Sequence, residues 1–405
     1  MLAVALVLAQ AKVLTLSDAL HSALRAQPTI AAADANTRAA AARVGEARAP
    51  LLPQLAAGGK WSFGDDPTTP GWSLGLTATQ TVWDGSGQLA RLGASRALVD
   101  AAAATAQSTR LQLALTVEQQ YFAACATRAL ADVAKESVDN QDQHLQQIEG
   151  FVRAGTRPEI DLAQARSDRA NAEVQLIAAR NNYALAKAQL AQSMGGDAGE
   201  FDVADATLDA VAGEDAPVDA LLDEALRARP ELAAAAAQLR AQGFTIAAAK
   251  DTFGPTLALS AGATESGAWG GSPGATWSVG AKLDWSLFSG GLSYYGVKEA
   301  EATRDALTAT RAALVLQVRF QIVQAQLGVH ANEAALAAAA TALENTREQL
   351  RLAEGRYAAG IGSVIELGDA QIAYANAGAQ SVQARYNVAS ARAALLEAVG
   401  RGPTV

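Results

Sequence analysis

The sequence has one cysteine and three histidines, which limits the chemistry available to the chain. Cys125 has no second cysteine with which to form an internal disulfide. His21, His144 and His330 lie far apart, without the His-x-x-x-His or Cys-x-x-Cys spacing of metal sites, so we expect solvated helix-face histidines and no metal or cofactor. The Gly-Ser pairs lack the strand-to-helix setting of a nucleophile elbow. We therefore predict that the chain is not an enzyme.

Long apolar runs and basic clusters are also missing. Beyond the first few positions, no run of eighteen apolar residues predicts a transmembrane helix. Residues 1–11 are apolar and end in Ala9-Gln10-Ala11, which is typical of the remnant of a secretory signal peptide, although a basic n-region is absent. The alternative is a trimmed apolar N-terminus. The net charge of −9, without a basic stripe, excludes nucleic acid as a predicted partner.

Only 5% of the residues are aromatic, whereas 50% are hydrophobic, and alanine dominates. Alanine-rich helices can approach one another closely, so this composition favours long, slender, coiled-coil-like packing.

The chain carries an internal duplication. Leu16 to Pro28, which contains Leu-Arg-Ala-Gln-Pro, corresponds to Val218 to Pro230, which contains Leu-Arg-Ala-Arg-Pro. The order that follows is the same in both halves: a second helix, a proline with two strands, a very long helix, a glycine turn and a last helix. We predict a first repeat at 16–194, a linker at 195–216 and a second repeat at 217–400. The linker is expected outside the helices, and disorder of part of it is the alternative.

Four segments alternate between apolar and polar residues with period two, which predicts two β-hairpins. We place the strands at about 54–64 and 71–83 in the first repeat, and at about 256–266 and 275–288 in the second. Each has one apolar face, and Phe63 belongs to that face in the first strand. Aromatic residues near the strand ends are predicted membrane-interface anchors: Trp72, Trp83, Trp277, Trp285 and Phe288.

Strand length and number then constrain the assembly. Residues 72–83 would extend about 36 Å, or about 27 Å along the membrane normal at a tilt near 40°, close to the roughly 25 Å apolar band of an outer-membrane barrel. Four strands cannot close a barrel, and unpaired strand edges are unfavourable in lipid. Three copies would supply twelve strands, so we predict a shared barrel.

Four helices make up most of the remainder. Two long helices, about 86–152 and 292–357, would each span roughly 100 Å, and shorter helices at about 158–194 and 363–399 return beside them. We therefore expect a helical cylinder that continues the barrel.

Each long helix ends in a glycine turn. Gly360 and Gly362 are expected to adopt positive φ, and Ser363 with Glu366 forms a predicted capping box. Thr156 with Glu159 is the matching box of the first repeat, with Pro158 in the first helical turn.

These features together resemble the TolC family of outer-membrane efflux and secretion ducts. The resemblance rests on Leu-Arg-Ala-x-Pro, Trp/Phe-(Asp/Ser)-Gly and Tyr-x-x-Gly-x-x-Ser-x-x-Glu, in the same duplicated order, from Leu16 to Gly400. It implies an α+β membrane protein in the outer membrane: a homotrimer with a twelve-stranded β-barrel and a periplasmic α-helical tunnel. An adaptor protein and an inner-membrane transporter would dock at the tunnel tips.

The resemblance also suggests which residues form the sites. Tyr357, Glu366 and Asp369 fall at positions that close the tunnel in family members, and Gly362 replaces an arginine found in some of them. The turns would supply the adaptor-docking tips: Gly155, Thr156, Arg157, Gly360, Ile361 and Gly362.

The residues themselves leave alternatives open at this gate. Glu366 and Asp369 share a helix face, so three chains would gather six carboxylates; Arg153, Arg157 and Arg356 are candidate closing links. Glu366 could instead act only as a helix cap, Asp369 as a solvated first-turn acid and Tyr357 as packing at a helix end. The rival function is a soluble, extended helical scaffold with two β-hairpins, and the transported substrate is not specified by the sequence.

Overall fold

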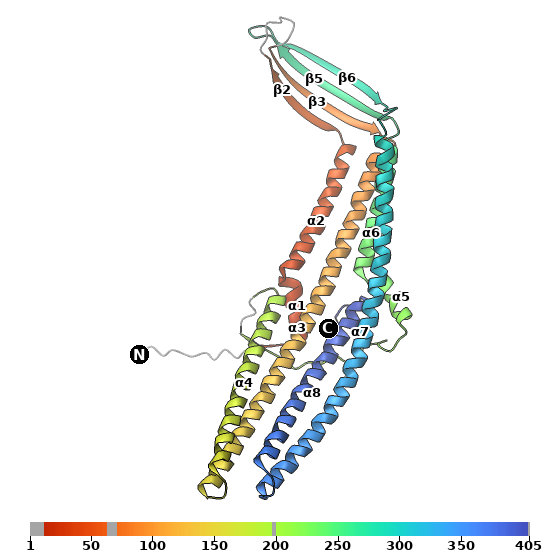
Figure 1. The fold of residues 1–405 in the computed structure, drawn as a ribbon. Coiled ribbons are helices and arrows are strands. Elements are labelled where there is room, and N and C mark those ends of the chain that lie inside the picture. The colour runs from red at the N-terminus through yellow and green to blue at the C-terminus, as the bar shows by residue number, and fades with distance from the viewer. Residues whose placement is uncertain (1–11, 63–70, 197–199, 404–405) are drawn as a thin grey trace, which may run out of the picture. The chain divides into compact units, whose positions relative to one another are not determined.

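We analysed a computed structural model that describes residues 12–62, 71–196 and 200–403 (Figure 1). The predicted signal remnant at 1–11, together with Phe63 and residues 197–199 of the predicted linker, lies outside the described residues. The elements are α1 (Leu16–Ala26), α2 (Pro28–Arg48), β2 (Gln54–Trp61), β3 (Trp72–Trp83), α3 (Gly87–Arg153), α4 (Glu159–Ser193), α5 (Val218–Ala228), α6 (Pro230–Asp251), β5 (Thr256–Gly267), β6 (Gly274–Asp284), α7 (Leu292–Ala358) and α8 (Val364–Val399), with short strands β1 (Lys12–Leu14) and β4 (Phe201–Val203) and a 3-10 turn, η1 (Ala49–Leu51).

The element order repeats, and the chain divides into two compact units. One, the sheet unit, comprises Ala32–Gln107 and Pro230–Leu316. The other, the helical unit, comprises Met1–Ala31, Ser108–Arg229 and Gln317–Val405, so α3 and α7 contribute to both. The absence of proline within these two helices allows each to continue for 67 residues.

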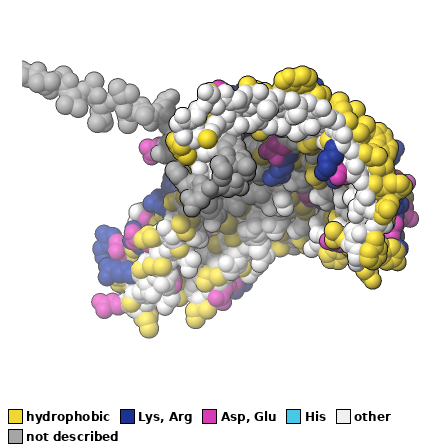
Figure 2. All heavy atoms as spheres, turned by 90° about the horizontal axis from the view of Figure 1, so that it is seen from above, with side chains coloured by type: hydrophobic (Ala, Val, Ile, Leu, Met, Phe, Trp, Pro, Cys, Tyr) yellow, Lys and Arg dark blue, Asp and Glu magenta, His cyan; other side chains and the backbone are white. Residues whose placement is uncertain are grey.

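The sheet unit contains one antiparallel sheet in the order β2-β3-β5-β6. The register aligns Ala57, Leu76, Ala263 and Trp277 across the four strands, so the predicted apolar faces combine into one. Hydrophobic side chains follow the outer side of the curved sheet, whereas mostly polar side chains and backbone line its inner side (Figure 2). The alternation predicted from sequence is thus confirmed, with Gln80 and Glu265 as polar exceptions on the apolar face.

The last strand is shorter than predicted, because β6 ends at Asp284. Trp285 and Phe288, predicted at a strand end, therefore lie in the connection to α7. The Trp285 indole donates to the Phe253 carbonyl at 3.1 Å and so joins this connection to the segment before β5.

Small residues let helices approach closely within the sheet unit. A Cβ placed on Gly93 of α3 would lie 2.9 Å from the Phe244 ring of α6. A larger side chain at this position would have to displace the ring, which agrees with the packing predicted from the composition.

The helical unit is built around Tyr121 and Phe122 of α3, which are fully buried with Leu20 and Leu190. The Tyr121 hydroxyl lies within hydrogen-bonding distance of the carbonyls of Leu14 and Ala204, at 3.0 and 2.8 Å, and its one proton can be shared between them. It therefore holds the parallel pair of β1 and β4 against the helices.

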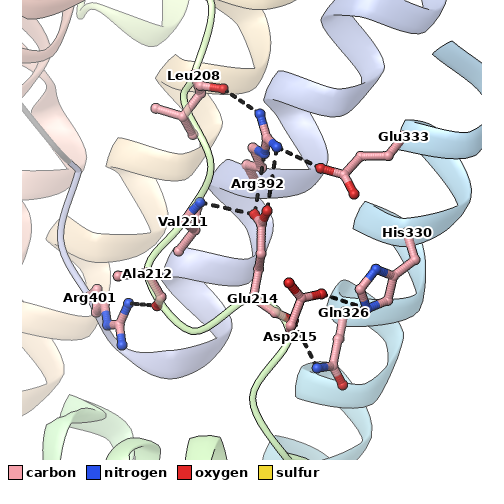
Figure 3. A network of polar contacts seen from close by, with 10 residues as sticks. All are labelled: Leu208, Val211, Ala212, Glu214, Asp215, Gln326, His330, Glu333, Arg392 and Arg401. Atoms are coloured by element: carbon pink, nitrogen blue, oxygen red, sulfur yellow. Dashed lines mark hydrogen bonds and ion pairs between the residues drawn. The ribbon is translucent and has the colours of Figure 1, made fainter. Parts of the chain in front are cut away.

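The described part of the linker is fixed to the helices by an ionic network (Figure 3). Arg392 of α8 contacts Glu214 at 3.3 Å and Glu333 of α7 at 2.6 Å, and donates to the Leu208 carbonyl at 2.9 Å. Arg392 and Glu214 are largely buried, and hydrogen bonds of this kind are among the stronger ones. The described residues 204–216 thus contact the helices at several points.

Among the described residues, one helix meets the length and composition of a membrane span, although none was predicted. A window within α7 reaches a mean hydropathy of 1.2, and 17% of it is buried. A single such window is weak evidence for a span.

Glu118 of α3 generates a prediction about stability. It is 3% exposed, and its Oε1 has no hydrogen-bond partner among the described residues. Burial raises the pKa of Glu118 from 4.5 to about 7, because the charged form loses its hydration. Below about pH 7 the folded chain therefore holds this carboxyl neutral, and its stability should decrease as the pH rises from 4.5 through about 7.

We expect Glu118→Gln to flatten this dependence and, above pH 8, to raise the free energy of unfolding by about 1–3 kcal/mol. Thermal unfolding followed by circular dichroism at several pH values measures the effect. Exposed Glu348, which pairs with Arg351, supplies the control variant Glu348→Gln. Parallel pH profiles for the wild type and Glu118→Gln would contradict the prediction.

Candidate functional site

The two helical hairpins of the helical unit, α3–α4 and α7–α8, end side by side in matching turns (Figure 1). Gly155 and Gly360 have φ values of +72° and +77°, the left-handed conformation that glycine adopts at low cost. In both turns, amide groups beyond the helix return to its last carbonyls: Thr156 N–H donates to Phe151, and Ile361 N–H to Arg356. These bonds satisfy groups that a helix end leaves unpaired.

Gly362 serves a different purpose from the one expected. Its φ is not positive, so that prediction is wrong. The residue is instead buried against the preceding helix, where an added Cβ would lie 2.9 Å from the Tyr357 nitrogen. Close backbone approach, rather than backbone conformation, therefore requires glycine here.

Of the two predicted capping boxes, the one at Ser363 is half formed and the one at Thr156 is absent. Ser363 Oγ accepts from Glu366 N–H at 3.1 Å, as expected, but the Glu366 carboxylate lies 3.0 Å from Arg356 Nε and joins the two helices of its hairpin. The box at Thr156 is wrong. Helix α4 begins after Pro158, which makes no side-chain cap, and the Thr156 hydroxyl donates back to Phe151 at 2.9 Å.

Tyr357 occupies the contact between the hairpins. It is 3% exposed, and its ring makes edge contacts with His144 at 5.4 Å and Phe151 at 6.4 Å, both from α3. The Arg157 guanidinium lies over the ring, 4.8 Å from its centroid. The Tyr357 hydroxyl is buried without a partner among the described residues, and burial raises its pKa. Its surroundings are apolar residues of all four helices: Ile148, Ala165, Leu350, Ala353, Leu367 and Ala370.

His144 was missed by the sequence analysis. It is 7% exposed, so the expectation of a solvated histidine is wrong at this position. Gln141, His144, Ile148 and Phe151 follow the three-and-four spacing of one helix face, a signal that could have placed the imidazole inside. Gln141 on this face donates to Gln371 of α8 at 2.9 Å, which gives the hairpins a polar contact as well.

The predicted gate acids and closing arginines differ in the contacts that they make. Asp369 has no ion pair among the described residues. It lines a groove with Asp161 and Gln164 of α4, which correspond to Glu366 and Asp369 in the first repeat. Arg153 bonds only the Glu149 carbonyl of its own helix, at 3.2 Å. Of the three candidate arginines, Arg356 and Arg157 therefore make the tip contacts. No group of three or more metal-ligating side chains occurs among the described residues.

The aromatic residues assigned to the membrane interface lie in the sheet unit. Trp72 and Trp83 are the first and last residues of β3, and Trp277 of β6 is 82% exposed. Phe288, beyond β6, is 87% exposed. The single chain leaves Trp83, Trp277 and Phe288 exposed, and their place at a membrane interface stays a prediction.

The family model described as "Outer membrane efflux protein" matches residues 19–196 and 221–401. The chain therefore belongs to the outer membrane efflux protein family. Two matches, one for each half, fit the repeated order of the elements.

Individual relatives agree with this assignment. The chain is 26% identical to the probable outer membrane lipoprotein SilC of Salmonella typhimurium over 82% of this chain and 76% of the relative. It is 23% identical to the outer membrane efflux protein BepC of Brucella suis, over 96% and 85%.

Solved structures share the fold. CusC superposes with a TM-score of 0.83 at 19% identity, covering 96% of this chain and 92% of CusC. VceC of Vibrio cholerae gives 0.81 at 21%, covering 96% of each. The predicted combination of long helices with a strand domain, the outer-membrane location and the function as an efflux duct are confirmed, in place of the soluble scaffold.

The His144–Tyr357 contact generates a pH prediction. Burial lowers the pKa of His144 below 6.5, and Asp168 of α4 opposes this shift without reversing it. The unfolded chain therefore binds a proton more readily, and stability should be lost as the pH falls below 6.5. Protonation would also place a cation among Tyr357 and Arg157, which already carries a positive charge.

We expect His144→Gln to remove part of this acid sensitivity, because glutamine stays neutral. The unfolding midpoint between pH 5 and 8 provides the measurement, and the exposed His21 supplies the control His21→Gln. If His144→Gln and His21→Gln change the acid limb equally, the buried histidine is not responsible.

Proposed function

We propose that three copies of this chain form one passive duct, with a twelve-stranded barrel in the outer membrane and a helical tunnel in the periplasm. The tunnel would receive substrates from a periplasmic adaptor and an inner-membrane transporter, and no enzymatic step is involved. One observation carries the proposal: a four-stranded sheet with an apolar face ends in β2 and β6, each with one neighbour in the described sheet. Pairing β6 with β2 of the next copy would satisfy both edges.

Exposed apolar side chains of the helical unit support the same assembly. Phe320 and Leu327 on α7 are 65% and 63% exposed, although the surrounding helix is long and apolar. Contact with a neighbouring copy would cover them and explain the apolar window without a membrane-spanning helix.

We further propose that Tyr357, Glu366 and Asp369 form the periplasmic gate. Tyr357 would hold the hairpins of one chain together, whereas the acids would set the charge at the constriction. Because Glu366 is paired with Arg356, the net negative charge comes mainly from Asp369. In the trimer, the three unpaired Asp369 carboxylates near the threefold axis would favour cations.

The duct and its gate are tested together with reconstituted protein. Detergent-purified chain should be a trimer and form cation-selective pores in planar bilayers. Asp369→Asn should lower the selectivity by removing an unpaired charge, and Glu366→Gln should lower it by exposing Arg356, whereas Ser363 can still cap the helix. The control Glu348→Gln removes an exposed, paired acid elsewhere on α7. A folded monomer, or unchanged selectivity in both gate variants, contradicts the respective part.

The turns are the proposed adaptor contacts, with Gly155, Thr156, Arg157, Gly360, Ile361 and Gly362 at the tips. Gly360→Ala would place a side chain at φ +77° and strain the turn by about 1–2 kcal/mol. We expect weaker adaptor cross-linking and reduced transport at normal abundance. Gly355→Ala is the matched control, because Gly355 lies in α7 with open space around it and no positive φ. Normal docking by Gly360→Ala would remove this turn from the contact.

A further inference from the structure

A groove runs between α4 and α8, with α3 as its floor, near the tips of the helical unit. Its volume of about 890 Å³ is within the range of sites that hold drug-sized molecules. Apolar side chains from all three helices line it, including Val133 of α3, Ile160 of α4, and Ile365 and Ile372 of α8. The three isoleucines are more than 60% exposed, so the single chain leaves this apolar surface uncovered.

The charge of the groove has one sign. Asp161, Asp168 and Asp369 line it, and no lysine, arginine or histidine does. None of the three forms an ion pair within the described part of the chain; Asp168 accepts one hydrogen bond, from Gln164 at 2.9 Å.

The nearby arginines do not pair with these three acids. Arg166 contacts Glu149 at 3.4 Å, Arg169 contacts Asp142 and Glu173 at 2.9 and 2.6 Å, and Arg356 contacts Glu366 at 3.0 Å. Arg157 lies over the Tyr357 ring. No ion pair within the described residues therefore balances the charge of the groove.

Shape and charge together select the chemistry of the occupant. An anion would meet three carboxylates. A bare metal ion would need ligands gathered at one point, and the described residues contain no such group. Apolar walls contribute to binding only if the occupant has apolar surface of its own. The remaining class is an organic cation with a hydrophobic body.

We propose that this groove is a binding site for amphipathic organic cations, held by the isoleucine walls and by Asp161, Asp168 and Asp369. That such cations are cargo entering the duct rests on the proposed function; the binding itself does not. The polar amides of Gln141 and Gln371 at the floor would accommodate the edge of an aromatic ring system.

Fluorescence titration with propidium, a planar aromatic dication, tests the proposal on full-length protein in nanodiscs of neutral lipid. We expect Asp168→Asn to weaken binding about two- to fivefold, and Asp161→Asn/Asp168→Asn about tenfold, as for partly exposed ion pairs. Ile372→Ser should weaken propidium binding about threefold while leaving competition by Mg²⁺ unchanged. Asp139→Asn is the matched control, since Asp139 is an exposed acid of α3 outside the groove.

Three results would overturn the proposal. They are equal propidium affinity in the wild type and the double variant, equal weakening by Asp139→Asn, and equally tight binding of the anionic dye anilinonaphthalene sulfonate. Circular dichroism identifies any variant that fails to fold, and Asp369→Asn then replaces it. The titration reads binding and the bilayer experiment reads conduction, so an empty groove in a conducting trimer rejects only this proposal, and a filled groove in a non-conducting chain rejects only the duct.

Discussion

Backbone hydrogen bonding is the constraint on which the sheet unit depends. A strand in lipid has no water with which to pair its N–H and C=O groups, and four strands are too few to close on themselves. The antiparallel order β2-β3-β5-β6 satisfies the inner strands and leaves the outer two dependent on neighbours. In one chain the apolar face of the sheet remains exposed, because no helix of the chain covers it. The proposed assembly of three copies would pair both edge strands and cover part of the exposed surface.

In the helical unit, the contact between the two hairpins consists mainly of apolar and aromatic side chains. The Tyr357 ring fills the space between them with apolar and aromatic contacts. Its hydroxyl has no hydrogen-bond partner among the described residues. Gln141 and Gln371 add one neutral hydrogen bond, of modest net value. Near the tips, the described residues contain no buried ion pair between the two hairpins, so separating the hairpins would leave no buried charge unpaired.

Local patterns predicted much of this structure, and contacts between distant residues account for what they missed. Period-two alternation identified the strands, and Gly360 was assigned a positive φ from its place after a long helix. The partner of Glu366 could not be read from the sequence, because a capping box and an ion pair with Arg356 use the same carboxylate. The close backbone approach at Gly362 is not visible in local spacing. The helix-face spacing of His144 indicates burial, but it does not identify the Tyr357 ring that the imidazole meets.

The parallel pairing of β1 with β4 has a consequence for the order of folding. Lys12 pairs with Phe201, so the strand that opens the described chain finds its partner only after the whole first repeat. Closing so long a loop is entropically unfavourable until intervening helices have shortened it, and contacts of this separation form slowly. On this argument the first hairpin would assemble early from local contacts, and Tyr121 would meet the Leu14 and Ala204 carbonyls later. The strand β1 would then join β4 only after the rest of the first repeat has folded.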